Sequence, residues 1–336
     1  MTSSHERRDN LIMREIKYAE ALREALAEEM RRDERVFVFG EDVALGYAFT
    51  VCKGLIDEFG PERVFDTPIC EQTIIGTAVG AAMMGMRPVP EIQFCDLLPM
   101  CMDQICNQAA KLRYMSGGQV SFPLVIRSPG GKWGSFAAQH SQTLDAWFMQ
   151  VPGLKVAVPA TPYDAKGLLK TAIRDNNPVL FIERKLLYQI PGPVPIEEYL
   201  IPFGEARIHT EGRDVTIVAI GRMLSEALEA FKLLEKDGIN ATVLDPRTLI
   251  PLDKNAILES VKLTHRLVIV EEGPKTGGVG AEISAIIAEE ALDYLDSPIR
   301  RVAALDTPIP FNKMLEDHIL PDRYKIVHAV KDLMST

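Results

Sequence analysis

The chain has 336 residues, of which 47% are hydrophobic and 25% are charged, and its formal net charge is −10. This composition is typical of a globular protein, and the length favours two domains. The excess of 47 acidic over 37 basic side chains excludes a nucleic-acid-binding protein and one that docks on anionic lipid. No apolar run reaches the roughly 20 residues of a membrane span. Five cysteines without C-x-x-C spacing favour a reduced environment, so we expect a cytoplasmic protein without zinc.

The first half of the chain alternates between short apolar runs and helical segments. Residues 1–12 are polar and charged, and we expect them to be a disordered extension. Helices are expected at 18–32, 73–86, 100–114 and 163–175, and strands at 36–40, 89–94, 123–128, 155–158 and 178–183. Continuous apolar strands of this kind are usually buried on both faces of a parallel sheet. The sequence therefore predicts an α/β domain over residues 13–187.

Prolines interrupt this pattern over residues 188–203, which we expect to be a linker because the segment is too proline-rich for a helix or a central strand. The alternation then resumes, with strands expected at 215–221, 241–245, 267–271 and 299–305 and helices at 223–236, 253–263, 280–295 and 322–334. Residues 204–336 form the second domain of this prediction. The predicted fold class is α/β, with two consecutive parallel-sheet domains.

A single carboxyl group stands where a strand is expected to turn into a helix. Glu71 follows the segment Asp-Thr-Pro-Ile-Cys and begins a helix of small and apolar residues. Ligands collect at such junctions in open α/β sheets. A helix that is apolar on all sides is buried, so Glu71 is expected to be poorly solvated. Its role is either proton transfer or simple complementation of the helix dipole, and the spacing does not separate the two.

A glycine-rich loop follows the strand expected at 123–128 and contains His140. Loops at the carboxyl ends of strands often carry function, and an imidazole exchanges protons near neutral pH. A structural or merely exposed histidine is the alternative. No G-x-S-x-G motif accompanies it, which disfavours a serine hydrolase.

A second glycine cluster, Gly278 and Gly280, offers part of a dinucleotide-binding fingerprint, but Ile283 occupies the position of its third glycine. A tight turn and close helix packing explain these glycines. A nicotinamide-dependent two-domain oxidoreductase is therefore only a remote alternative.

The segment 172–177 is expected at the end of a helix, where backbone carbonyls lose their helical partners. It forms either a plain asparagine-rich turn or, together with Asp175, a site for a monovalent cation. The spacing leaves both interpretations open.

Taken together, these segments resemble the beta subunit of the thiamine-diphosphate-dependent 2-oxo acid dehydrogenases, the first component of the pyruvate, acetoin and branched-chain complexes. The matching segments are 40–42, 66–71, 78–82, 103–105, 114–118, 126–129, 139–142, 152–156, 164–168, 172–178 and 245–248. The resemblance implies a pyrimidine-binding domain followed by a transketolase-like C-terminal domain. It also implies oxidative decarboxylation of a 2-oxo acid, with transfer of the acyl group to the lipoyl group of an acyltransferase core. Segments 185–188 and 201–206 favour the pyruvate or acetoin members. We expect pyruvate as the substrate, with acetoin or a branched 2-oxo acid as the alternative.

The resemblance also assigns roles to single residues. Glu71 matches a glutamate that shares a proton with a ring nitrogen of the aminopyrimidine, and His140 matches a histidine near the incoming lipoyl group. Leu97 stands where several relatives carry an aromatic ring beside the pyrimidine, and leucine offers apolar contact without ring stacking. A potassium site of the family, built mainly from backbone oxygens, corresponds here to Leu124, Ala172, Asp175 and Asn177.

One motif of thiamine-diphosphate enzymes is absent from the sequence: it contains no G-D-G, which begins the motif that holds the diphosphate through Mg²⁺. The resemblance implies that a separate alpha subunit carries this motif in an α2β2 tetramer. The chain is therefore expected to bind only the aminopyrimidine end and to be inactive alone. A non-catalytic scaffold subunit is the third alternative, and activity of the chain with and without an alpha partner separates the three.

Overall fold

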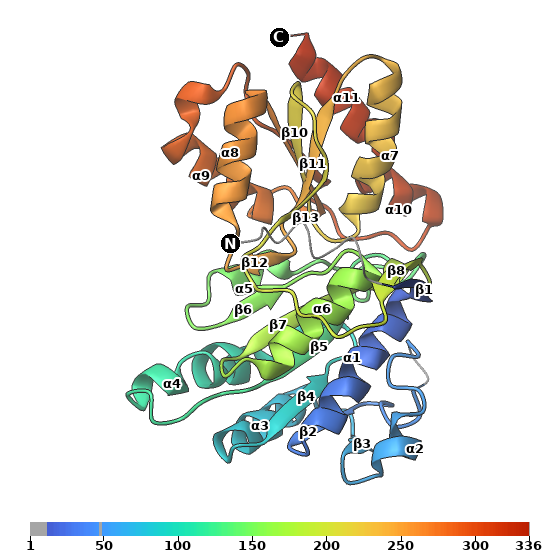
Figure 1. Cartoon of the computed structure of the whole chain (residues 1–336), viewed down its shortest axis with the longest axis vertical. Helices are drawn as coiled ribbons and strands as arrows, with labels where there is room; N and C mark the ends of the chain where they lie inside the picture. Colours follow the sequence, from blue (N-terminus) through green and yellow to red (C-terminus); the bar gives the residue numbers. More distant parts are fainter. Residues whose placement is uncertain (1–11, 47–48, 336) are drawn as a thin grey trace.

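The computed structural model describes residues 12–46 and 49–335, which form two stacked lobes, each with a central sheet between helices (Figure 1). A disordered extension was expected over residues 1–12. Residues 1–11 lie outside the described residues, and the side chain of Ile12 is exposed.

The N-terminal lobe contains a seven-stranded sheet in the order β12-β6-β7-β5-β4-β2-β3. Six strands are parallel, and β12 pairs with β6 in the antiparallel direction. Because β12 comes from the second half of the chain, the sheet joins the two lobes, which the sequence did not predict. The strands are β2 (Val36–Gly40), β3 (Val64–Asp66), β4 (Arg87–Glu91), β5 (Val125–Gly130), β6 (Lys155–Ala157), β7 (Val179–Arg184) and β12 (Thr248–Ile250).

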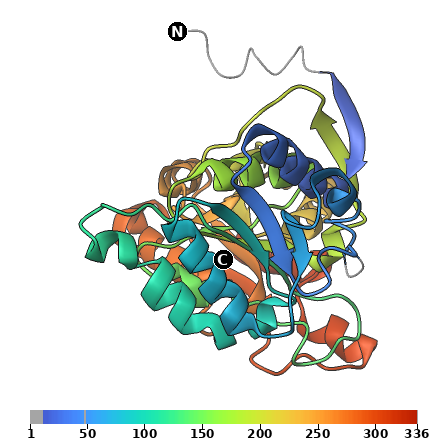
Figure 2. The same cartoon turned by 90° about the horizontal axis from the view of Figure 1, so that it is seen from below.

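Helices cover both faces of this sheet (Figure 2). Along β2, Val36 and Val38 pack with α1 and α6, whereas Phe37 and Phe39 pack with α3 on the opposite face. This alternation follows from the two-residue period of a strand. The helices of the lobe are α1 (Tyr18–Arg32), α2 (Leu55–Phe59), α3 (Glu71–Met83), α4 (Leu112–Met115), α5 (Asp145–Met149) and α6 (Pro162–Arg174).

The prediction of one regular α-helix over residues 100–114 is wrong. The segment contains a 3₁₀ helix, η1 (Cys95–Cys101), a π-helix, η2 (Asp103–Ala109), and the short α4. Pro99 lies inside η1 and has no N–H to donate, so the chain enters this segment without a regular α-helical ladder.

The proline-rich segment expected as a linker contains a strand, β8 (Pro191–Pro195), which pairs with β1 (Met13–Lys17) in a separate two-stranded ribbon. The N–H of Ile196 donates to the carbonyl of Ile12 at 3.0 Å, so the backbone N–H and C=O groups of the even-numbered residues of β8 point toward β1. The three prolines stand at odd positions, where a backbone N–H would point away from β1. Proline is tolerated in this arrangement because no ladder hydrogen bond is lost.

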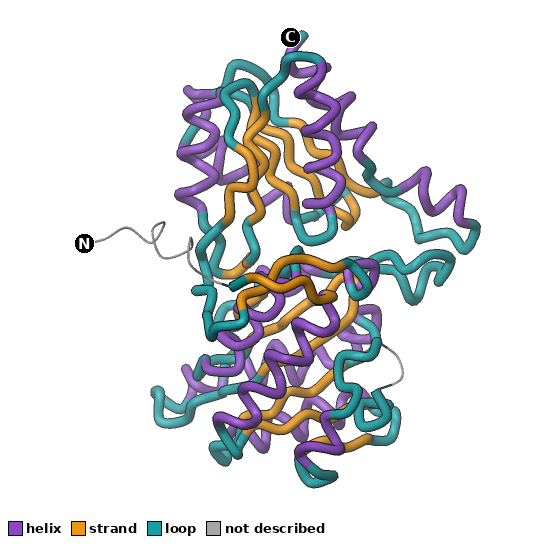
Figure 3. Tube along the Cα trace, turned by 45° about the vertical axis from the view of Figure 1, so that its right-hand side comes forward, coloured by secondary structure: helices purple, strands orange, loops and turns teal. Residues whose placement is uncertain are grey.

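The C-terminal lobe contains a five-stranded sheet in the order β14-β13-β10-β11-β9, parallel except for β9 (Figure 3). α7 and α11 pack on one face, and α8 and α9 on the other. Its elements are β9 (Arg207–Thr210), β10 (Val215–Ala219), β11 (Ala241–Asp245), β13 (Leu267–Pro274), β14 (Arg300–Ala304), α7 (Met223–Lys236), α8 (Lys254–Thr264), α9 (Val279–Glu290), α10 (Lys313–Ile319) and α11 (Arg323–Met334). Among the described helices, none is long and apolar enough to cross a membrane.

A buried ion triad joins three neighbouring strands of the larger sheet. The Arg127 guanidinium on β5 contacts Glu91 of β4 at 2.7 Å and Glu183 of β7 at 2.6 Å. All three side chains are buried, and burial raises the pKa of Glu91. Removing the shared cation leaves two carboxylates buried without a counter-charge, which is far more costly than losing an exposed pair.

We therefore expect Arg127→Met to lower the free energy of unfolding by about 3–5 kcal/mol. The control is Arg31→Met, which breaks the exposed pair between Arg31 and Glu58 and should cost at most about 1 kcal/mol. Urea unfolding of the two variants at neutral pH measures the difference. Equal losses in the two variants would contradict the importance of the triad.

Candidate active site

Glu71 lies at the carboxyl edge of the seven-stranded sheet, as predicted. It is the first residue of α3, directly after the connection from β3, and its side chain is only 7% exposed. α3 itself differs from the expectation of a helix buried on all sides. Its residues Gln72, Thr73, Gly76 and Gly80 are exposed, because only one face packs on the sheet.

The carboxylate of Glu71 receives no hydrogen bond or ion pair from any residue in 12–46 or 49–335. The nearest charges are acidic. Burial raises the pKa of Glu41, and the carboxylates of Asp42 and Glu71 raise it further. Most of the Glu71 residue is buried, while its carboxylate oxygens are not fully enclosed by the chain. This edge of the sheet therefore holds an acid suited to an external proton acceptor.

The 3₁₀ helix η1 connects Glu71 to the rest of the site. Burial and the charge of Glu71 together raise the pKa of the Cys101 thiol to about 12, and this thiol lies 4.0 Å from the carbonyl of Leu97. The N–H of Leu97 donates to the carbonyl of Phe94 at 2.9 Å. Leu97 is half-buried and packs on the core beside α3. The structure thus brings Leu97 to the same edge as Glu71.

His140 lies in the loop after β5, and its ring meets Phe94 edge-to-face with centroids 5.4 Å apart. The ammonium of Lys185, at the end of β7, donates to the carbonyl of His140 and lies 4.6 Å above the Phe94 ring. Burial lowers the pKa of Lys185, although nearby acidic groups oppose this. His140 itself is half-exposed.

Sequence reasoning did not find Glu41, Phe94 or Lys185. One signal was available for each: Glu41 directly follows a predicted buried strand, Phe94 ends one, and Lys185 lies two residues after another. In a parallel sheet the carboxyl ends of neighbouring strands meet at one edge. Reading the residues after all five strands, rather than the motifs alone, would have collected them.

The four residues predicted for potassium lie at the opposite edge of the sheet, where α6 turns into β7. The carbonyl of Leu124 accepts the N–H of Val179 at 2.8 Å, and the carbonyl of Ala172 accepts that of Asp175 at 3.2 Å. The Asp175 carboxylate accepts the backbone N–H of Asn177 at 2.9 Å and pairs with Lys155. Burial disfavours the charge of Asp175, yet Lys155 and Asn177 hold its pKa below the ordinary value.

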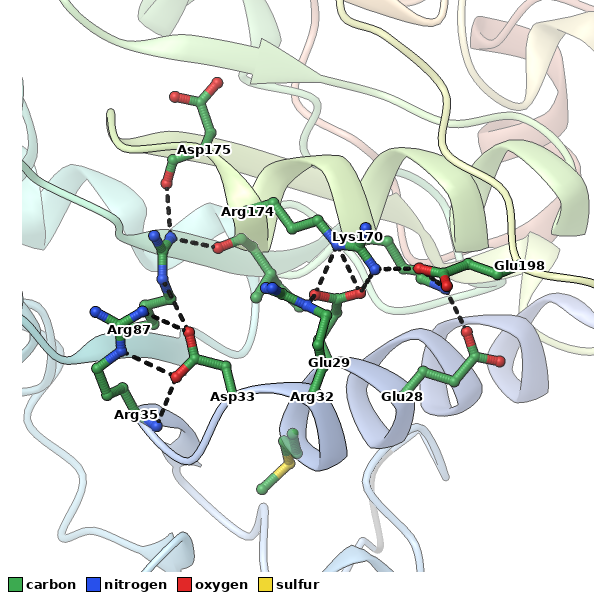
Figure 4. Close-up of polar contacts among 12 residues, drawn as sticks. Glu28, Glu29, Arg32, Asp33, Arg35, Arg87, Lys170, Arg174, Asp175 and Glu198 are labelled. Carbon is green, nitrogen blue, oxygen red and sulfur yellow. Dashed lines mark hydrogen bonds and ion pairs between the residues drawn. The ribbon is translucent and has the colours of Figure 1, made fainter.

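Arginine side chains also bind this turn (Figure 4). Arg87 donates to the carbonyls of Ile173 at 2.8 Å and Asp175 at 3.1 Å, and Arg113 donates to the side chain of Asn177 at 2.6 Å. The cationic groups of the protein thus already contact part of the oxygen cluster. The potassium site stays a prediction.

Comparison with known proteins identifies the family. Residues 14–191 match the transketolase pyrimidine binding domain, and residues 204–326 match the transketolase C-terminal domain. The chain is 48% identical over 318 residues to the pyruvate dehydrogenase E1 component subunit beta of Rickettsia bellii, covering 94% of this chain and 98% of that protein. It belongs to the family of 2-oxo acid and acetoin dehydrogenase beta subunits.

Two further beta subunits, both from Bacillus subtilis, are similarly related. The chain is 46% identical over 334 residues to subunit beta of the acetoin:2,6-dichlorophenolindophenol oxidoreductase, covering 96% of this chain and 98% of that one. It is 46% identical over 319 residues to the 2-oxoisovalerate dehydrogenase subunit beta, with coverages of 94% and 98%. Identity alone therefore does not separate the three substrates.

Solved structures agree with the fold. A split-gene transketolase in an inactive β4 tetramer is 26% identical with a TM-score of 0.76, covering 95% of this beta subunit and 99% of that chain. A transketolase mutant from Pichia stipitis matches in fold alone, with 14% identity, a TM-score of 0.70 and coverages of 96% and 46%. The predicted α/β class with two domains is confirmed.

The glycine cluster near residue 278 of this beta subunit holds one of its own carboxylates. Glu271, within β13, accepts the N–H groups of Val279 at 2.8 Å and Gly280 at 2.9 Å. A Cβ at Gly278 would lie 2.6 Å from the same carboxylate, so the glycine is required by this close approach. Glu271 therefore occupies the N-terminus of α9, which is the place where a dinucleotide-binding enzyme would bind pyrophosphate.

Glu271 also makes stability depend on pH. Burial raises its pKa from 4.5 to about 7, against the effect of the two N–H donors. Between these two values the folded chain holds a proton that the unfolded chain has lost. The free energy of unfolding should therefore fall as the pH rises through this window, by up to about 1.4 kcal/mol per pH unit.

The variant Glu271→Gln removes this proton and should lack that part of the slope. Urea unfolding of the wild type and the variant between pH 4.5 and pH 8 measures the difference. Glu282→Gln, which changes an exposed carboxylate on the same helix, is the control and should keep the wild-type slope. Identical slopes in the wild type and Glu271→Gln would refute the assignment.

Proposed function

We propose that the chain is the beta half of a thiamine-diphosphate-dependent 2-oxo acid dehydrogenase that decarboxylates pyruvate, and that it acts only together with an alpha subunit. The observation that carries the proposal is Glu71, an acid 7% exposed and without a donor among the described residues. A pyrimidine nitrogen is the kind of proton acceptor that such a group would meet. The family membership supports the same cofactor.

The residues around Glu71 fit the aminopyrimidine. The ring is flat and largely apolar with polar nitrogens at its edge, and the site offers one acid beside the half-buried Leu97. Glu71 would hold a proton at the pyrimidine ring nitrogen, and Leu97 would contact the ring without stacking on it. When bound, thiamine diphosphate supplies the carbon nucleophile and the electron sink for decarboxylation.

His140 would act in the last step of the reaction, the transfer of the acyl group. Its half-exposed imidazole is held by Phe94 and Lys185. An imidazole near neutral pH could give a proton to a sulfur of the lipoyl group as the acyl group is transferred. We therefore assign acyl transfer to the lipoyl group of the acyltransferase core to His140.

The requirement for an alpha subunit rests on two observations. The sequence lacks the G-D-G that would hold Mg²⁺ and the diphosphate, so we assign both to the partner in an α2β2 tetramer. Large apolar side chains are also exposed at the two ends of α3, Ile69 at 69% just before its start and Met84 at 84% just after its end. We propose that the alpha subunit covers this helix. We propose potassium as an additional structural ion at Leu124, Ala172, Asp175 and Asn177.

Glu71→Gln should nearly abolish decarboxylation while leaving assembly with the alpha partner intact. The amide cannot transfer a proton to the pyrimidine, and loss of a positioned acid typically costs about 10²–10⁴-fold. The measurement is turnover with an artificial electron acceptor, with pyruvate, acetoin and 2-oxoisovalerate tested side by side. Glu62→Gln, an exposed carboxylate shortly before β3, is the matched control. Turnover of Glu71→Gln within about threefold of the control would show that Glu71 only complements the helix dipole.

A further inference from the structure

The loop that carries His140 has an unusual backbone. It runs from the end of β5 to the start of α5, and its residues Gly131, Gly134, Ser135 and Ala137 all have φ between 60° and 85°. Ser135 and Ala137 are not glycines, so this left-handed conformation is unfavourable for them. Such backbone persists only where surrounding contacts hold it.

Glu272 of β13 holds the beginning of the loop. Its carboxylate accepts the N–H of Lys132 at 3.2 Å, and a Cβ at Gly131 would lie 2.5 Å from its other oxygen. Although burial alone would raise its pKa, Arg222 and Arg184 outweigh burial and hold the pKa of Glu272 below the ordinary value. The loop therefore turns around an ionised carboxylate of the C-terminal lobe.

Glu316 of α10 holds the middle of the loop. Its fully buried carboxylate accepts the N–H of Ser135 at 3.2 Å, at one of the two unfavourable residues. The same oxygen lies 3.6 Å from the Lys132 ammonium, which also pairs with Asp317. Two residues further on, the carbonyl of Ala137 accepts the backbone N–H of His140 at 3.4 Å. Glu316 thus holds the backbone at Ser135, two residues before the carbonyl that accepts the N–H of His140.

We propose that Glu316 and Glu272, two buried carboxylates of the C-terminal lobe, are positioning residues that fix the glycine-rich loop so that the His140 imidazole faces the incoming acyl acceptor. This rests on the proposed role of His140. It gives the C-terminal lobe a part in acyl transfer, although none of its side chains is assigned to the reacting groups. A hydrogen bond from a backbone N–H to an ionised carboxylate is roughly twice as strong as one between neutral groups.

The test uses the full chain assembled with its alpha partner and makes two measurements on each variant. Hydrogen exchange, followed by mass spectrometry of peptides spanning residues 131–140, reports on the loop. The ratio of lipoyl-dependent activity to activity with an artificial electron acceptor reports on acyl transfer relative to decarboxylation.

In Glu316→Ala, exchange in the loop should accelerate roughly tenfold because one buried hydrogen bond is lost. The activity ratio should fall roughly tenfold or more because the imidazole is misplaced. Glu316→Gln keeps an acceptor oxygen and should rescue both readouts to within about threefold. Asp317→Asn is the matched control: it removes the neighbouring charge on α10 that does not contact the loop backbone, and should change neither readout.

Two additional variants keep the outcome decisive. If Glu316→Ala does not assemble, Glu316→Asp keeps the charge but withdraws the oxygen from Ser135, and the same changes are expected. In a chain that already carries His140→Ala, Glu316→Ala should lower the activity ratio no further. Unchanged loop exchange in the alanine or aspartate variant, or an equal fall in both activities, would overturn the proposal. If His140→Ala alone leaves the ratio unchanged, the role of His140 fails; if only the Glu316 variants leave it unchanged, the positioning role fails by itself.

Discussion

The carboxyl edge of the larger sheet depends on one buried cation, the Arg127 guanidinium. It joins β4, β5 and β7 by satisfying Glu91 and Glu183 at once, and Tyr188 donates to Glu183 at 2.6 Å. These are the strands whose ends lead to Phe94, to the His140 loop and to Lys185. Because the triad is closed to solvent, it holds the strand ends in one arrangement, and the loops that follow inherit that geometry.

Glu71 differs from the two acids that Arg127 binds, because no described residue donates to its carboxylate. Several acids of this region are bonded within the chain: Glu91 and Glu183 to Arg127, Asp66 to the N–H of Ala44 at 2.7 Å, and Glu272 to Lys132. Glu71 alone among these carboxylates is buried without a described donor, and it lies beside exposed apolar side chains. Glu71 thus lacks an internal donor at the place where a cofactor and a second subunit are proposed to meet. On this account the chain supplies one half of the proposed cofactor site.

The sequence predicted the fold class and most strands, because buried parallel strands are continuous apolar runs. It also placed Glu71 at a junction between strand and helix, and His140 in the loop that follows the strand expected at 123–128. It missed β12, whose three residues pair across the lobes, since pairing between distant segments leaves no local pattern. The forms of η1 and η2 were missed for a local reason, because Pro99 inside η1 has no N–H to donate and the chain enters this segment without a regular α-helical ladder. Glu316 could not be found either: its partner, Ser135, is 181 residues away, and only the packed lobes bring the two together.

The most direct test of the shared site is a calorimetric titration of thiamine diphosphate with Mg²⁺ into the chain alone and into the chain assembled with its alpha partner. If the chain holds only the pyrimidine end, binding should be weak or undetectable alone and tight, saturable and Mg²⁺-dependent in the assembly. Adding Glu71→Gln to the assembly shows whether that carboxyl group contributes to the binding. Tight, Mg²⁺-dependent binding to the isolated chain would contradict the account.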